Sequence, residues 1–204
     1  RVSDNYIVCD GDWLNSGDTK DEASDKIGYV AGQMKKHFGE SYFPFVGNHD
    51  YNYLGVDSEG VRLPSSEWIS NEAMKNFMFQ NFTGCYYKFK KQVAMNYVLN
   101  SRTDYDNIND YDKGMLDWLA GNLVSDNPEH STVMTHILHL TDQASEIPKR
   151  IKCVGKIIEA FNNHTTLTLT NAADGYDKTY DFRSTSGHVD YVLAGHSHAD
   201  FIET

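Results

Sequence analysis

Four groups of polar residues each follow directly after a short apolar run, and this arrangement constrains the fold more than any other feature of the chain. Each apolar run has the length of a buried strand, so each polar group is expected at the carboxyl end of a strand. The four groups, in chain order, are Asp10-Gly11-Asp12, Gly47-Asn48-His49-Asp50, Thr135-His136 and Gly195-His196-Ser197-His198.

The first fifty residues predict a strand, a helix and a second strand. Thr19 and Glu22 have the spacing of a capping box, apolar residues follow at helical spacing from Ile27 to Phe38, and Gly39 suits a helix C-terminus. Apolar runs at 6–9 and 42–46 flank this helix. A strand, crossover helix and strand of this kind predicts a parallel pairing of the two strands.

The remainder of the chain also predicts a mixture of helices and strands, and it includes two hairpins. We find no internal repeat and no linker, so residues 1–204 are predicted to form a single domain. The expected elements are an irregular stretch over 51–70, a helix over 71–80, a hairpin over 86–99, helices around 115–123 and 148–161, a hairpin over 165–183, and strands at 131–135 and 189–194.

The polar groups contain the side chains that bind divalent metals. Carboxylate and amide oxygens and imidazole nitrogens are hard to borderline ligands, and parallel strands bring their carboxyl ends to one edge of a sheet. The sequence therefore predicts a site for one or two divalent metals. His139 competes with His136 as a ligand, but His136 lies nearer the strand end. Asp10 could support the metal ligands without binding the metal itself, but a role as a turn residue is favoured.

In this order and in these strand contexts, the motifs resemble the calcineurin-like metallophosphoesterase family, from about Tyr6 to His198. Gly-Asn-His-Asp is the most specific of them. The resemblance implies an α/β fold of two packed mixed β-sheets flanked by helices, a four-layer αββα sandwich. It also implies two divalent metal ions, whose identity among Mn, Fe, Zn, Ni and Mg the ligand types leave open.

The resemblance also implies a role for each matching residue. Asp12 would bridge the two metals, Asn48, His136 and His196 would complete the second site, and His198 would bind the first metal. His49 would be the catalytic imidazole, with Asp50 orienting it. Two metals can clamp a phosphoester and activate water, while the imidazole protonates the leaving oxygen.

One family motif is absent, because no Asp-x-His precedes Gly11-Asp12 in this sequence. We therefore expect the first metal site, left with Asp12 and His198, to be weak or empty. The chain also begins at Arg1 without a methionine and stops shortly after His198, so we expect the domain to be truncated at both ends.

Composition limits the classes of substrate and partner that this protein can have. Eighteen Lys and Arg against 29 Asp and Glu give a net charge of −11, which disfavours a nucleic-acid substrate and hence a nuclease. No apolar run is long enough to span a membrane and no signal peptide is visible, so compartment and oligomeric state stay open. Three widely spaced cysteines predict neither a disulfide framework nor a metal site.

Two hypotheses follow. The first is a metal-dependent hydrolase of a small phosphomonoester or phosphodiester, with a dinuclear centre and His49 as general acid. The second is a catalytically impaired module of the same fold that binds or supports other parts of a larger protein. Trp13, Tyr51, Tyr53 and Trp68 lie beside the motifs and could line a substrate pocket, although aromatic residues more often pack in the core.

Overall fold

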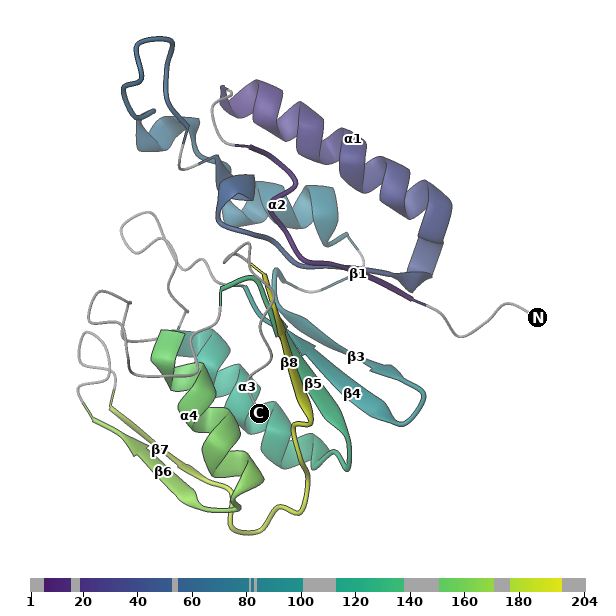
Figure 1. Ribbon diagram of the computed structural model, residues 1–204, viewed down its shortest axis with the longest axis vertical. Coiled ribbons are helices and arrows are strands. Elements are labelled where there is room, and N and C mark those ends of the chain that lie inside the picture. Colours follow the sequence, from purple (N-terminus) through teal and green to yellow (C-terminus); the bar gives the residue numbers. More distant parts are fainter. Residues whose placement is uncertain are drawn as a thin grey trace.

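A computed structural model of the chain contains three β-sheets, four α-helices and three short 3₁₀ turns among the residues it describes. The described residues are 6–15, 19–52, 55–80, 82, 84–100, 113–137, 151–170 and 177–195. Figure 1 shows α1 and α2 at one end of the molecule and the largest sheet, with α3 and α4, at the other.

The first unit is the predicted strand, helix and strand. Strand β1 (Ile7–Cys9) pairs in parallel with β2 (Tyr42–Pro44). Helix α1 (Lys20–Phe38) connects them, and the short 3₁₀ turn η1 (Gly39–Ser41) follows it. The Thr19 side chain accepts a hydrogen bond from the Glu22 backbone, and Glu22 returns one, so the predicted capping box is confirmed.

The largest sheet has the strand order β3-β4-β5-β8 and mixes both pairing directions. The predicted hairpin is confirmed, because β3 (Tyr87–Lys91) and β4 (Ala94–Val98) are antiparallel. Strand β5 (Ser131–Thr135) is parallel to both β4 and β8 (Tyr191–Ala194). The carboxyl ends of β4, β5 and β8 therefore meet at one edge of this sheet.

Alternate residues of this sheet enter two separate hydrophobic clusters, as the two-residue period of a strand requires. Tyr97 and Val133 belong to the cluster shared with α3 (Lys113–Asp126) and α4 (Ile151–Asn162). Val98 and Met134 belong to the cluster shared with β2, α1 and α2 (Asn71–Met78). The order of layers is therefore helices, β1-β2, the four-stranded sheet, and helices, which confirms the predicted αββα arrangement (Figure 1).

Three smaller elements complete the described chain. The predicted second hairpin is confirmed by the antiparallel strands β6 (Thr166–Leu169) and β7 (Lys178–Asp181). The 3₁₀ turn η3 (Ser65–Glu67) lies within the stretch predicted to be irregular, and the turn η2 (His49–Tyr51) ends at its first residue. In the part of the chain that the structure describes, no helix has both the length and the apolar character needed to cross a bilayer.

Candidate metal centre

The loops that follow β1 and β2 pack so closely that their backbone atoms are in contact. A Cβ atom built on Gly47 would lie 2.5 Å from the backbone nitrogen of Asp12 and would overlap the Asp12 carboxylate. A Cβ on Gly11, which has a φ of +86°, would overlap the backbone of Gly47. Only glycine permits this approach, so both glycines of the sequence motifs bring Asp12 next to the Gly47–Asp50 turn.

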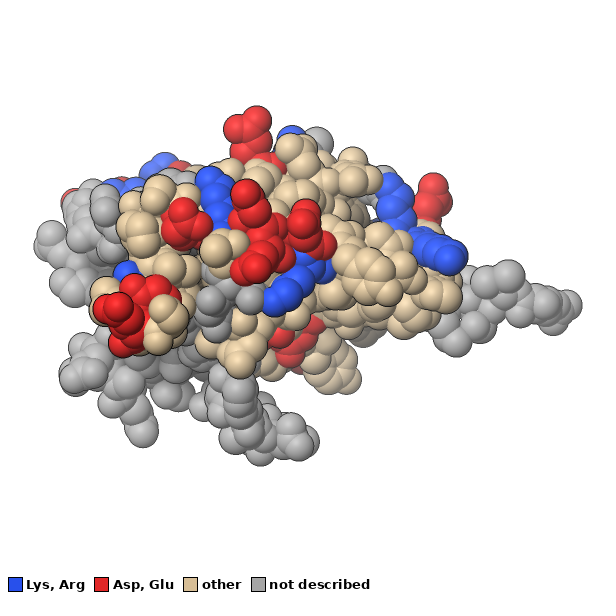
Figure 2. Space-filling view, turned by 90° about the horizontal axis from the view of Figure 1, so that it is seen from above, with Lys and Arg blue, Asp and Glu red and all other residues tan. Residues whose placement is uncertain are grey.

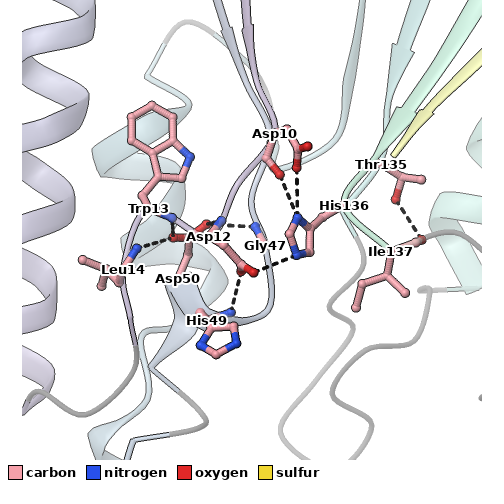
Figure 3. Close-up of polar contacts among 10 residues, drawn as sticks. All are labelled: Asp10, Asp12, Trp13, Leu14, Gly47, His49, Asp50, Thr135, His136 and Ile137. Carbon is pink, nitrogen blue, oxygen red and sulfur yellow. Dashed lines mark hydrogen bonds and ion pairs between the residues drawn. The ribbon is translucent and has the colours of Figure 1, made fainter. Parts of the chain in front are cut away.

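Asp12 contacts His136, which lies 124 positions later in the chain and follows strand β5 of the four-stranded sheet. The Asp12 Oδ2 atom is 3.0 Å from the His136 Nε2 atom, and the His136 side chain is 3% exposed (Figure 3). Burial opposes ionisation of Asp12, but the hydrogen bond and charge of His136 outweigh it and hold the pKa of Asp12 below its ordinary value. Burial likewise disfavours the charged imidazole, yet Asp10 and Asp12 raise the pKa of His136 to about 10.

Asp50 connects the two loops through its buried carboxylate. Its Oδ2 accepts hydrogen bonds from the backbone N–H groups of Asp12 (2.9 Å) and Gly47 (2.8 Å). Its Oδ1 accepts from those of Trp13 (2.6 Å) and Leu14 (3.2 Å) (Figure 3). Burial raises the pKa of Asp50 to about 7 against the effect of these donors, and the nearby Asp12 charge adds to the increase.

Sequence analysis gave Asp50 the role of orienting His49. All four hydrogen bonds of its carboxylate go to backbone N–H groups, not to the imidazole of His49. In Figure 3 that imidazole projects away from the Asp50 carboxylate. An effect of Asp50 on His49 would therefore act through the backbone, and the orienting role stays a prediction.

His49 and Asn48 lie where strand β2 leads into turn η2. The backbone N–H of His49 donates to Asp12 Oδ1 over 3.0 Å, so the two oxygens of Asp12 face His49 and His136 respectively. Asn48 is buried, whereas His49 is only partly buried. The backbone of His49 therefore lies beside the Asp12–His136 pair, and its imidazole stays partly open to solvent.

Sequence analysis favoured a turn role for Asp10 and assigned no role to Asn100. The main-chain oxygen and Oδ1 of Asp10 lie 2.7 and 3.1 Å from Nδ1 of His136. The buried Asn100, which follows β4, donates from Nδ2 to the Tyr51 hydroxyl over 2.7 Å. Tyr51 is 1% exposed and therefore packs in the core instead of lining a pocket. Position directly after a strand was the only signal for Asp10 and Asn100.

The predicted ligands are brought together in part. Asp12 and His136 are in contact, and Asn48 is buried and directly precedes His49, whose backbone N–H contacts Asp12. The other predicted ligands, His196 and His198, lie outside the described residues, as do His139 and Tyr53. Across the ranges that the structure describes, no three His, Cys, Asp or Glu side chains are grouped to hold a metal ion. A carboxylate and an imidazole converging on one point nevertheless fit a divalent metal in their donor chemistry.

The chain matches a protein-family model over nearly its whole length. The family model described as calcineurin-like phosphoesterase matches residues 2–200. The chain therefore belongs to the calcineurin-like phosphoesterase family, which confirms the resemblance drawn from the sequence motifs. Proteins of this family are metal-dependent hydrolases of phosphoesters in general. Comparisons with curated proteins and with solved structures gave no match.

Proposed function

We propose that this protein hydrolyses a small phosphomonoester or phosphodiester with a dinuclear metal centre and His49 as general acid. The observation that carries the proposal is the 3.0 Å approach of Asp12 Oδ2 to His136 Nε2, which joins a carboxylate and an imidazole from two different sheets. Asp12 would bridge the metals, Asn48, His136 and His196 would hold the second, and His198 the first.

The metals, when bound, would neutralise charge on the phosphate oxygens and lower the pKa of water. The protein's own groups do the rest. Asp12 and His136 provide ligand atoms, and the hydrogen bond from the His49 backbone holds Asp12 Oδ1 in place. The His49 imidazole would donate a proton to the departing alkoxide, a contribution worth roughly 10²–10⁴-fold in rate.

The charge of the molecule supports a small substrate. The net charge is −11, and Figure 2 shows acidic side chains interleaved with basic ones on the face seen there. Among the described residues on that face, Lys and Arg form no continuous band of the kind that follows a nucleic-acid backbone.

The metal site is tested with His136→Ala and Asp12→Asn. Asp12 has a φ of +53°, and Asn tolerates this conformation nearly as well as Asp, so Asp12→Asn removes the charge without new backbone strain. We expect both variants to lose Zn²⁺ binding, measured by calorimetry, and hydrolysis of aryl phosphate mono- and diesters. Unchanged Zn²⁺ affinity in both variants would overturn the proposed site.

The general acid is tested with His49→Ala and a series of leaving groups. A proton donor matters most when the leaving oxygen is basic, so turnover of an alkyl phosphate should fall by roughly 10²–10⁴-fold. Turnover of a nitrophenyl phosphate should fall much less, and Zn²⁺ affinity should stay at the parent value. An equal loss for both leaving groups would exclude His49 as the acid. A protein that binds Zn²⁺ but hydrolyses no ester would instead be the predicted non-catalytic module.

A further inference from the structure

Asp10 contacts the side of His136 that faces away from Asp12. Its main-chain oxygen is 2.7 Å and its Oδ1 atom 3.1 Å from His136 Nδ1, while His136 Nε2 is 3.0 Å from Asp12 Oδ2 (Figure 3). The imidazole is therefore held between two carboxylates that Gly11 separates in the sequence. We propose that Asp10 is a positioning residue that fixes His136 as a metal ligand.

The chemistry follows from the two ring nitrogens. A neutral imidazole carries its proton on one nitrogen and its lone pair on the other, and an acceptor beside one nitrogen keeps the proton there. Asp10 places two acceptors at Nδ1, so in the neutral ring that a metal requires, the proton stays on Nδ1 and the lone pair of Nε2 is directed toward Asp12. A carboxylate on the far nitrogen also makes the imidazole a more basic ligand.

The same geometry excludes Asp10 as a ligand for a metal bound at Nε2. Asp10 Oδ1 and Asp12 Oδ2 lie on opposite ring nitrogens, so the ring separates the two carboxylates. The side chain of Asp10 is 53% exposed and that of His136 is 3% exposed, so the partner acts from the solvent side on a buried ring. Asp10 therefore supports the proposed ligand His136 and is not itself a further ligand.

The end of strand β8 supplies an independent observation. A Cβ atom on Gly195 would overlap Oδ1 of Asp10 and lie 2.5 Å from Oδ2, so the absence of a side chain at Gly195 makes room for the carboxylate. The Gly195 N–H also donates to the main-chain oxygen of His136 over 3.1 Å. Asp10, His136 and Gly195 therefore form one contact set at the ends of β1, β5 and β8.

The proposal rests on the proposed metal site and predicts a loss of affinity without a loss of fold. Removing a carboxylate that supports a metal-bound histidine typically costs 10–100-fold in affinity. Because the main-chain oxygen of Asp10 remains, we expect Asp10→Ala to weaken Zn²⁺ binding by about 10-fold, the lower end of that range. Asp10→Asn keeps an acceptor oxygen and should recover part of the loss.

The experiment uses the full chain with Zn²⁺ alone as the probe. Affinity is measured by calorimetry, the tautomer of His136 by the ¹⁵N shifts of its ring in the Zn²⁺-loaded protein, and thermal unfolding in the metal-free protein. Gly195→Ala, which would displace the Asp10 carboxylate, should reproduce the loss seen in Asp10→Ala. Asp10→Ala should also change the ¹⁵N shift of His136 Nδ1, because that nitrogen loses one of its two acceptors.

Asp190→Asn is the matched control. Asp190 Oδ2 lies 3.2 Å from Nδ1 of His130, a similar carboxylate–imidazole contact at the opposite end of β5, and this variant should bind Zn²⁺ as the parent does. Parent-like affinity and ring shifts in Asp10→Ala would overturn the proposal, as would an equal loss in Asp190→Asn. If His136→Ala also keeps the parent affinity, the metal site itself is wrong, which distinguishes the two failures.

Discussion

The two halves of the candidate site are held in different ways. One half is the loop pair, residues 11–14 and 47–50, where four backbone N–H groups donate to the single carboxylate of Asp50. The other half is His136 on the four-stranded sheet, whose ring is held by side-chain and main-chain oxygens of Asp10 and Asp12. One buried carboxylate that accepts from four backbone N–H groups thus fixes the first half, whereas contacts from two residues to a single ring position the second half.

The largest effect is expected where the loop pair loses its carboxylate. Asp50→Ala leaves buried N–H groups without an acceptor, and we expect a loss of about 3 kcal/mol or more in unfolding free energy, measured by urea denaturation. Asp50→Asn should be nearly as damaging, because its amide NH₂ would face two of the four donors. A stable Asp50→Asn variant with slow turnover would instead favour the predicted role in orienting His49.

A smaller loss is expected where the two loops touch. A Cβ on Gly47 would collide with the Asp12 backbone, so Gly47→Ala should cost about 2 kcal/mol of unfolding free energy. Gly32→Ala is the matched control, because Gly32 lies within α1 and a Cβ there would meet no atom within 4 Å. That variant should gain roughly 0.5–1 kcal/mol from helix propensity. Equal behaviour of the two variants would contradict the close packing.

The hydrogen bond that joins turn η2 to the end of strand β4 should contribute less to the unfolding free energy. Tyr51→Phe removes the hydroxyl that accepts from Asn100 Nδ2, and we expect a loss of about 1 kcal/mol in unfolding free energy. The ring itself stays in place, so the cavity cost of a larger deletion is avoided. A loss as large as that of Asp50→Ala would show that this hydrogen bond, and not Asp50, holds turn η2 in position.

The smallest effect is expected far from the site. Asp190→Asn changes a contact with His130 whose side chains are 28% and 52% exposed, so unfolding free energy should change by less than about 0.5 kcal/mol. Thermal unfolding of this variant beside Asp50→Ala measures how much more a buried carboxylate contributes than an exposed one. A large loss here would remove the distinction between the two.

Periodicity was sufficient for the elements of the fold but not for the contacts of the site. The capping box at Thr19, both hairpins and the parallel pairing of β1 with β2 are confirmed, because each depends on local spacing. The hydrogen bonds of Asp50 depend on the backbone conformation of Asp12, whose positive φ no local pattern revealed. The contact of Asp10 with His136 spans 126 positions, and only the folded chain brings them together.

Sequence separation also orders the assembly of the site in time. The hydrogen bonds that Asp50 makes with Asp12, Trp13 and Leu14 close segments of 36–38 residues, whereas Asp10 and His136 are 126 apart. Because closing a longer segment costs more chain entropy and slows contact formation, the loop pair can form before His136 arrives. We therefore expect a nascent chain to complete its first half-site well before it gains the imidazole that would let it capture a metal.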